Sequence, residues 1–395
     1  MRRYRLIKPI KRKRVIIMKK ISKILSALCA AAVSASLFAV TPSAAGGWKT
    51  SYADILTKEL KSSDKKSEGG KAFSVYDLNS DGTPELIVSP GLSDYTYGVK
   101  CKIYTYSNGK AVSVGDIKSV GTIEFYPSSG ILSGSFSEDD LREYKYTKMS
   151  GNSLKTVKTY SESYNSSSYT WDFKIDGKKV SSDKYYDGMF DLCGNDPVTL
   201  GRSYMLNKDS ISYAVKGISS YKKAYSKFLT GGYRNETFGV SDDVSYFYTY
   251  DITGDKTPEL FVRGGSKTVI YTFADKRVQY FGENDTYIYS YDADPKYETY
   301  ITPDKKNMMF SASVSKYKSS SYSFCSLSKG HLEKNLSISN DISPVTEELY
   351  YSSSDGDISA GEFKKLLKEN KKSSFKCISS DQRKLTSSNV KKVFG

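Results

Sequence analysis

The chain has 395 residues, with 59 Lys and Arg against 44 Asp and Glu, which gives a formal net charge of +15. The first 45 residues hold 11 of the basic residues and no acidic one, so the remainder is nearly balanced, with 48 basic against 44 acidic residues. The excess of basic charge therefore belongs to the N-terminus, and the composition predicts no nucleic-acid partner.

Residues 18–45 read MKKISKILSALCAAAVSASLFAVTPSAA, in which two lysines precede an apolar run and a small-residue cleavage site ends at Ala45. This pattern predicts a secretory signal peptide that starts at Met18, and hence an extracellular protein. No later apolar run is long enough to span a bilayer. Export permits disulfides, but pairing and free thiols both stay open for the four remaining cysteines, Cys101, Cys193, Cys325 and Cys377.

The motif YDLNSDGTPELIV at residues 76–88 returns as YDITGDKTPELFV at residues 250–262, an offset of 174 residues. Upstream, YADIL matches YSKFL, and downstream KIYTYSNGK matches VIYTFADKR, in the same order. The repeat is of domain size, so it predicts a tandem duplication and not a solenoid. The predicted segments are residues 1–45 (extension and signal peptide), 46–200 (module 1), 201–217 (linker), 218–377 (module 2) and 378–395 (C-terminal tail).

Each module is predicted to begin with an amphipathic helix, because Tyr52 and Leu56 in the first copy, and Tyr225 and Leu229 in the second, fall on one helical face. Short alternating runs follow, separated by hairpin signals such as Asn108-Gly109. The predicted fold class is α+β: two tandem homologous modules, each a mainly antiparallel β-meander with a helix at each end. The alternative is a propeller-like all-β fold.

The first acidic loop has oxygen-bearing side chains at alternate positions, a spacing that lets them converge on a hard cation. Numbered from its first aspartate, the loop has glycine at position six, but it lacks the glutamate that an EF-hand carries at position twelve. It resembles the D-x-[DN]-x-D-G-x-x-[DE] calcium loops of FG-GAP and VCBS-type extracellular repeats, over the loop alone. The resemblance implies Ca²⁺ ligands at Asp77, Asn79, Asp81, Thr83 (through its carbonyl) and Glu85.

The second loop retains fewer of these features. Lys256 replaces the glycine and is expected to bring a cation to the site, and a threonine replaces the asparagine. The candidate ligands that remain are Asp251, Asp255, Thr257 and Glu259. For both loops the alternative is a structural corner between two strands, in which the aspartates accept backbone N–H groups.

A third acidic segment, DGDISAGEF at residues 355–363, matches the second half of an EF-hand loop. We prefer a hairpin followed by a helix, because Ser359 and Glu362 form a capping-box pattern before an apolar run. The chain has one histidine, His331, so neither a histidine-dependent triad nor a multi-histidine zinc site is expected.

Tyrosine is abundant, with 34 residues, and two segments interleave aromatic residues with serine, at 161–171 and 315–324. Such strands can present flat rings to a sugar or a partner protein, although β-propensity alone also selects tyrosine. The leading hypothesis is a secreted, non-catalytic, calcium-stabilised protein that binds a glycan, a cell surface or a partner protein. The alternatives are a secreted carboxylate-dependent hydrolase and a structural module without metal.

Overall fold

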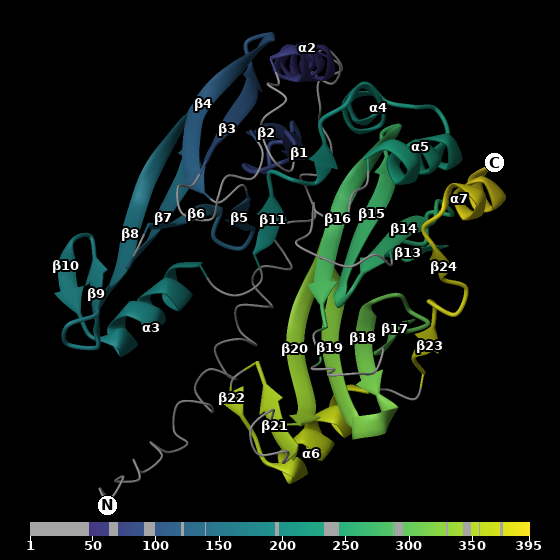
Figure 1. The fold of residues 1–395 in the computed structure, drawn as a ribbon. Helices are drawn as coiled ribbons and strands as arrows, with labels where there is room; N and C mark the ends of the chain where they lie inside the picture. The colour runs from purple at the N-terminus through teal and green to yellow at the C-terminus, as the bar shows by residue number, and fades with distance from the viewer. Residues whose placement is uncertain are drawn as a thin grey trace, which may run out of the picture. The chain divides into compact units, whose positions relative to one another are not determined.

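Four antiparallel sheets and a few helices form this β-rich chain (Figure 1). The expected extension and signal peptide, residues 1–45, lie outside the described residues. The computed structural model describes residues 47–62, 70–90, 99–119, 122–138, 140–193, 197–232, 245–286, 288, 295–328, 331–342, 349–354, 356–371 and 374–395.

The first half, residues 46–217, forms a five-stranded sheet in the order β12-β1-β2-β3-β4 and a seven-stranded sheet in the order β10-β9-β8-β7-β6-β5-β11. Its elements are α2 (Gly47–Lys61), β1 (Ala72–Tyr76), β2 (Glu85–Ser89), β3 (Val99–Ser107), β4 (Lys110–Ser119), β5 (Ile123–Tyr126), β6 (Ile131–Glu138), β7 (Leu141–Ser150), β8 (Ser153–Asn165), β9 (Thr170–Ile175), β10 (Lys178–Val180), α3 (Ser182–Cys193), β11 (Val198–Leu200), β12 (Tyr204–Met205), α4 (Lys208–Ile211) and η1 (Ser212–Lys216).

The second half, residues 218–395, has the same strand order, with a five-stranded sheet β24-β13-β14-β15-β16 and a seven-stranded sheet β22-β21-β20-β19-β18-β17-β23. Its elements are α5 (Tyr221–Lys227), η2 (Phe228–Gly232), β13 (Ser245–Tyr250), β14 (Glu259–Gly264), β15 (Lys267–Ala274), β16 (Arg277–Asp285), β17 (Lys296–Ile301), β18 (Asn307–Val314), η4 (Ser315–Tyr317), β19 (Ser319–Ser328), β20 (His331–Ile342), β21 (Leu349–Ser353), β22 (Gly356–Asp357), α6 (Ala360–Asn370), β23 (Lys376–Cys377), β24 (Arg383–Lys384) and α7 (Ser387–Phe394).

Turn and cap chemistry sets the local structure as predicted. Asn108 and Gly109 both have positive φ, 52° and 78°, which closes the two-residue hairpin between β3 and β4. The hairpin and helix expected over residues 355–363 are also confirmed. Ser359 is the N-cap of α6, and its Oγ accepts the Glu362 N–H at 3.1 Å.

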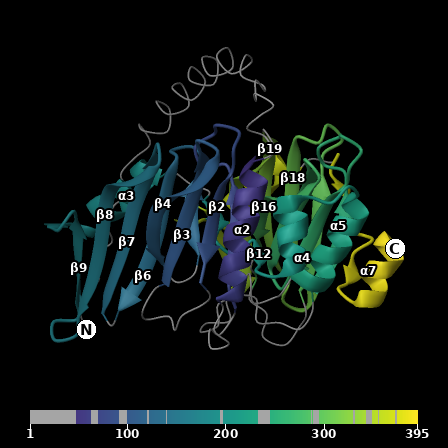
Figure 2. The same cartoon turned by 90° about the horizontal axis from the view of Figure 1, so that it is seen from above.

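Each five-stranded sheet is buried on both faces. In β2, Leu86 and Val88 face a core beneath the helices, whereas Ile87 faces a second core against the seven-stranded sheet. The helices α2, α4, α5 and α7 cover the outer faces of the five-stranded sheets (Figure 2). On the far faces of the seven-stranded sheets, α3 packs through Tyr185 and α6 packs through Phe363. Each half is therefore layered as helix, sheet, sheet, helix.

The helix-side core is continuous across the two halves. It includes Tyr52 and Phe73 from the first half and Phe228 and Phe247 from the second, all 0% exposed. The Tyr204 hydroxyl donates a hydrogen bond to the backbone carbonyl of Val278 at 2.9 Å, which also joins the halves. The two predicted modules therefore share one apolar core.

The segments predicted as a linker and a tail carry secondary structure. The linker 201–217 contains β12, which pairs with β1 through Tyr204, and the short helix α4. The tail 378–395 contains β24, which pairs with β13, and α7, whose Val390 and Phe394 are buried in the shared core. These elements are too short for their periodicity to be read from the sequence.

The four cysteines of the described chain are free thiols, and burial raises the pKa of the Cys101 thiol to about 12. A thiol in such surroundings is largely unreactive. Among the residues that the structure describes, no helix is long and apolar enough to cross a membrane.

Candidate functional site

The first acidic loop is the turn between β1 and β2, and its carboxylates point back into the loop. The carboxylate of Asp77 accepts the Asp81 N–H at 3.2 Å and the Gly82 N–H at 2.9 Å. Asp81 Oδ1 in turn accepts the Thr83 N–H at 2.7 Å. Gly82 has φ +84°, so glycine suits the position. The loop is thus a tight corner built on side-chain-to-backbone hydrogen bonds.

Asn79 joins the two ends of this corner. Its Nδ2 donates to Asp81 Oδ2 at 2.9 Å and to Glu85 Oε1 at 3.4 Å, while its Oδ1 accepts the Asp81 N–H at 3.0 Å. The structure therefore brings the predicted ligands Asp77, Asn79, Asp81 and Glu85 together in one hydrogen-bonded group. Thr83 contributes its N–H to the same group.

Glu85 is the buried member of the group, with 0% of the residue exposed. Its carboxylate accepts the Leu78 N–H at 2.8 Å and the Thr105 hydroxyl at 2.9 Å. Burial, with a smaller contribution from the charges of Asp81 and Asp77, raises the pKa of Glu85 to about 7. Burial also raises the pKa of Asp77. Burial therefore disfavours the ionised form of Glu85 in particular, and a cation at the loop would favour it.

The described part of the chain contains no group of three or more His, Cys, Asp and Glu side chains arranged to hold a metal ion. In the first loop the oxygens that a cation would use are already hydrogen-bonded, in part to the Asn79 amide. A bound Ca²⁺ would have to take over the contact between Asn79 and Asp81, with the asparagine presenting its oxygen to the ion.

The second loop, between β13 and β14, repeats the same backbone contacts. Asp251 accepts the Gly254 N–H at 2.6 Å, and Asp255 accepts the Thr257 N–H at 2.7 Å. Glu259, also 0% exposed, accepts the Ile252 N–H at 2.8 Å. Burial raises the pKa of Glu259 as it does that of Glu85. The corner is therefore a feature that both loops share.

A lysine from another hairpin supplies the cation of the second loop. The Nζ of Lys305, in the turn between β17 and β18, lies 3.2 Å from Asp251 Oδ2. Burial alone would raise the pKa of Asp251, but the Gly254 N–H and the Lys305 ammonium outweigh it, and the pKa is lowered. Lys256, expected from the sequence to bring this charge, instead donates its backbone N–H to Asp251 at 3.3 Å. Lys305 is far away in the sequence, so no local pattern identified it.

A tyrosine from the first helix of each half supports each loop. The Tyr52 hydroxyl donates to the carbonyl of Pro84 at 2.9 Å, and the Tyr225 hydroxyl donates to that of Pro258 at 3.1 Å. Both tyrosines are 0% exposed. In each loop the Pro-Glu pair is thus held by the hydrogen bond from the helix tyrosine to the proline carbonyl, as well as by the hydrogen bonds of the turn itself.

Exposed rings gather at one end of the seven-stranded sheet of the first half. Tyr164 and Trp171 are paired across β8 and β9, with ring centroids 5.1 Å apart. Tyr186 and Phe190 lie one turn apart on α3, which packs on the same face of that sheet. Trp171, Tyr186 and Phe190 are 44%, 54% and 56% exposed. We call Tyr164, Trp171, Tyr186 and Phe190 the aromatic face.

Polar groups lie among these rings. The buried carboxylate of Glu162 accepts hydrogen bonds from Arg142 at 3.4 Å and from the Tyr186 hydroxyl at 3.3 Å. The Arg142 guanidinium also lies over the Trp171 ring, 5.9 Å from its centroid. This contact joins the ring pair on the strands to the tyrosine on α3. The aromatic face is therefore a fixed, amphipathic surface.

A cleft of about 630 Å³ lies beside α3, lined by Tyr160 and Ile175 of the sheet and by polar side chains of the helix. Its charged lining residues are Lys158, Lys184, Asp187 and Asp191. Lys184, Asp187 and Asp191 lie on α3, and Lys158 lies on β8. At 100° per residue these α3 side chains lie on the flank of the helix opposite to Tyr186 and Phe190, so the cleft is separate from the aromatic face.

The second half lacks these rings at the matching register positions. Where Tyr164 pairs with Trp171 between β8 and β9, Ile342 pairs with Leu349 between β20 and β21. The residues that follow the buried Phe363 of α6 at the spacing of Tyr186 and Phe190 are Lys364 and Lys368. The second tyrosine-serine segment, residues 315–324, instead packs Tyr322 and Phe324 beneath α6. Only the first segment exposes its rings.

Comparisons with known proteins add no family. No protein-family model matches the chain, and no curated protein matches it. Among solved structures, a protein from Lactobacillus plantarum is 12% identical, with 73% of this chain and 80% of that chain covered, at a TM-score of 0.17. A candidate 6-phosphogluconolactonase from Bacteroides fragilis is 9% identical, with 75% and 96% covered, at 0.19. TolB from Acinetobacter baumannii is 11% identical, with 77% and 65% covered, at 0.15. TM-scores this low assign neither a fold nor a function.

Proposed function

We propose that this is a secreted, non-catalytic binding protein that holds a glycan on the aromatic face of its first half. The observation that carries the proposal is the group of exposed rings around the Glu162–Arg142 pair. Sugar rings present flat C–H surfaces that stack on aromatic faces, and their hydroxyls need hydrogen-bond partners at the edges. Trp171 and Tyr186 can supply the flat rings, and Arg142, which lies over the Trp171 ring, can supply hydrogen bonds.

The second half supports a functional interpretation of these rings. It has the same strand order, yet it carries leucine or lysine where the first half exposes Trp171, Tyr186 and Phe190. The rings are therefore not required to build such a sheet and helix. An exposed group of large apolar side chains that the fold does not need is typical of a binding surface.

The two halves are proposed to be tandem homologous modules that arose by duplication, in preference to the propeller-like alternative. Support comes from the identical strand order and from the matching contacts of Tyr52 and Tyr225 with the two loops. Terminal segments β12 with α4, and β24 with α7, occupy the same place in each half. The repeat thus includes the predicted linker and tail.

Calcium is proposed to bind the first loop and to stabilise the corner between β1 and β2. Among the described residues the carboxylates of the first loop form no ion pair, whereas Asp251 of the second loop pairs with the Lys305 ammonium. Burial raises the pKa of Asp77, whereas at Asp251 the Gly254 N–H and the Lys305 ammonium outweigh burial and lower the pKa. At a Ca²⁺ concentration 10–100 times Kd, binding would add about 1.4–2.7 kcal/mol to the free energy of unfolding.

Glycan binding can be tested with purified residues 46–395 on an array of plant, microbial and host polysaccharides. A variant that combines Trp171→Leu, Tyr186→Lys and Phe190→Lys should lose binding at least tenfold and keep its melting temperature. The matched control is Tyr350→Ala, which removes a ring that is 37% exposed in the second half. Equal binding by all three proteins would contradict the assignment of the aromatic face.

Calcium binding is tested separately by thermal melting in EDTA and across a Ca²⁺ titration. The wild type should be stabilised, the combined Asp77→Ala and Asp81→Ala variant should not respond, and the matched Asp251→Ala and Asp255→Ala variant should still respond. A melting temperature of the wild type that is the same in EDTA and in excess Ca²⁺ would rule out the metal.

A further inference from the structure

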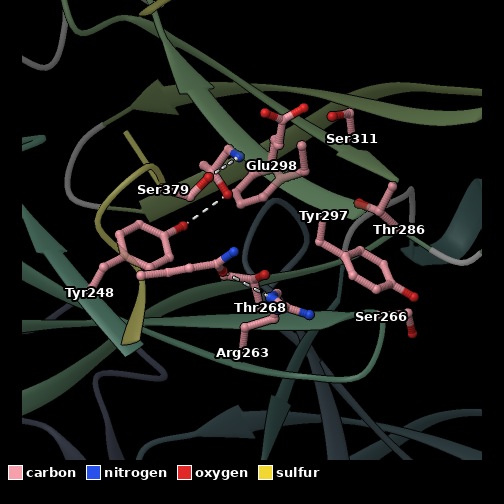
Figure 3. Close-up of a pocket in the computed structure, with 12 residues that line it drawn as sticks. Tyr248, Arg263, Ser266, Thr268, Thr286, Tyr297, Glu298, Ser311 and Ser379 are labelled. Atoms are coloured by element: carbon pink, nitrogen blue, oxygen red, sulfur yellow. Dashed lines mark hydrogen bonds between the residues drawn. The ribbon is translucent and has the colours of Figure 1, made fainter. Parts of the chain in front are cut away.

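Arg263 of β14 occupies an unusual position for a charged side chain. Successive residues of β14 alternate between the two cores, and Arg263 follows Phe261 on the side that faces the seven-stranded sheet. The guanidinium lies between two tyrosine rings, 4.5 Å from the centroid of Tyr246 and 4.8 Å from that of Tyr297. The side chain is half-buried at the edge of a pocket between the two sheets (Figure 3).

Among the described residues, the hydrogen-bond acceptors of this guanidinium are neutral. Its Nε donates to Gln382 Oε1 at 3.4 Å, and its Nη1 donates to the Gly265 carbonyl at 3.2 Å. In the part of the chain that the structure describes, no carboxylate lies within ion-pair distance of Arg263. Among the described residues that line the pocket, Glu298 is the acidic one; it pairs with Lys296 at 2.9 Å and points away from Arg263 in Figure 3.

A half-buried cation with neutral partners is costly unless a negative charge comes close. Burial lowers the pKa of Arg263, in agreement with a charge that is incompletely compensated. The fold does not demand arginine here: by the register of the β1–β2 and β13–β14 pairs, Ser89 occupies the matching position in the first half. Within the described residues the guanidinium therefore has no acidic partner, and an anion from solution would supply one.

Pocket size and lining restrict what this counter-ion can be. The centre of a water-sized sphere can occupy about 10 Å³ of this pocket. The pocket therefore has room for about one particle of that size. The surrounding hydroxyl groups, which can donate hydrogen bonds to an anion, belong to Ser266, Thr268, Thr286, Thr299, Ser311 and Ser379. A sulfate, a phosphate or a sugar carboxylate is too large for this space. We propose that the pocket binds a single halide ion, chloride, against the Arg263 guanidinium.

The test is thermal melting of residues 46–395 in sodium gluconate, with chloride or bromide added at constant ionic strength. The wild type should show a saturable rise in melting temperature, about 2 °C at ten times Kd. Arg263→Met keeps an apolar stem between the two tyrosine rings and should abolish the rise. Lys110→Met, which removes an exposed cation elsewhere, should leave it unchanged. A general salt effect would instead be linear in concentration and equal in all three proteins.

Bromide-soaked crystals of the wild type provide a second readout that does not depend on the folding of any variant. An anomalous peak beside the Arg263 guanidinium would support the halide site. A peak-free pocket, or a wild-type melting temperature that does not depend on halide, would show that water fills the space and would overturn the proposal. Either result is independent of glycan binding and of calcium, because neither uses residues of this pocket.

Discussion

Replacing Glu85 with Gln gives the sharpest test of how the first loop balances its charge. Burial raises the pKa of Glu85 from 4.5 to about 7. In the unfolded chain the carboxyl ionises near its ordinary value, while in the folded chain it keeps its proton to higher pH. The stabilisation from the protonated form is therefore complete below about pH 4.5 and is lost as the pH rises through about 7. A shift of this size corresponds to about 3 kcal/mol.

The assay is urea denaturation in EDTA at about pH 5 and about pH 8.5, where most of this difference should be visible. The wild type should lose about 2–3 kcal/mol between the two conditions, and Glu85→Gln should lose much less, because glutamine does not titrate. Glu259→Gln is the matched control and should remove a smaller part of the pH dependence. Excess Ca²⁺ should abolish the alkaline loss in the wild type, since a cation favours the ionised form. Equal losses in wild type and Glu85→Gln would refute the reasoning.

Three further changes give distinct outcomes. Lys305→Met should raise the pKa of Asp251 towards its ordinary value, as measured by NMR titration of the carboxyl. It should also lower the free energy of unfolding at neutral pH by about 0.5–1 kcal/mol, as measured by urea denaturation. An unchanged pKa would contradict the ion pair. Tyr52→Phe should lower the free energy of unfolding by about 0.5–1.5 kcal/mol because the half-buried Pro84 carbonyl loses its donor, and a neutral effect in the same assay would exclude that contact. Gly134→Ala should lower the free energy of unfolding by about 1–3 kcal/mol, because a Cβ there would overlap strand β4 of the facing sheet. A melting temperature equal to that of the wild type would show that β6 can shift.

The local features of the fold could be predicted because they depend on nearby residues. The hairpin at Asn108-Gly109 follows from backbone conformation alone, and the start of α6 follows from Ser359. The π-helical turn Phe228–Gly232 that continues α5 was not predicted, because a change of helix type leaves the apolar spacing almost intact. The shared core between the halves was also missed, because no pattern within one half indicates what covers its helices.

The candidate site shows the same limit. Asp77, Asn79, Asp81 and Glu85 lie together as their spacing predicted, because a tight turn brings alternate residues to one side. The ammonium of Lys305 reaches the second loop from a different sheet, so only the folded chain brings it to Asp251. Likewise, the two tyrosine-serine segments have similar compositions, and only the packing of α3 and α6 decides which rings remain exposed.

The core that both halves share has a consequence for how the protein can change over time. A symmetric homodimer of one module would carry every substitution twice, once on each surface. Here the apolar core common to both halves lies within a single polypeptide, so a substitution in one half is not repeated in the other. The first half exposes Trp171, Tyr186 and Phe190, and the second half has Lys305 beside its acidic loop. A single chain thus permits a division of labour that identical subunits cannot achieve.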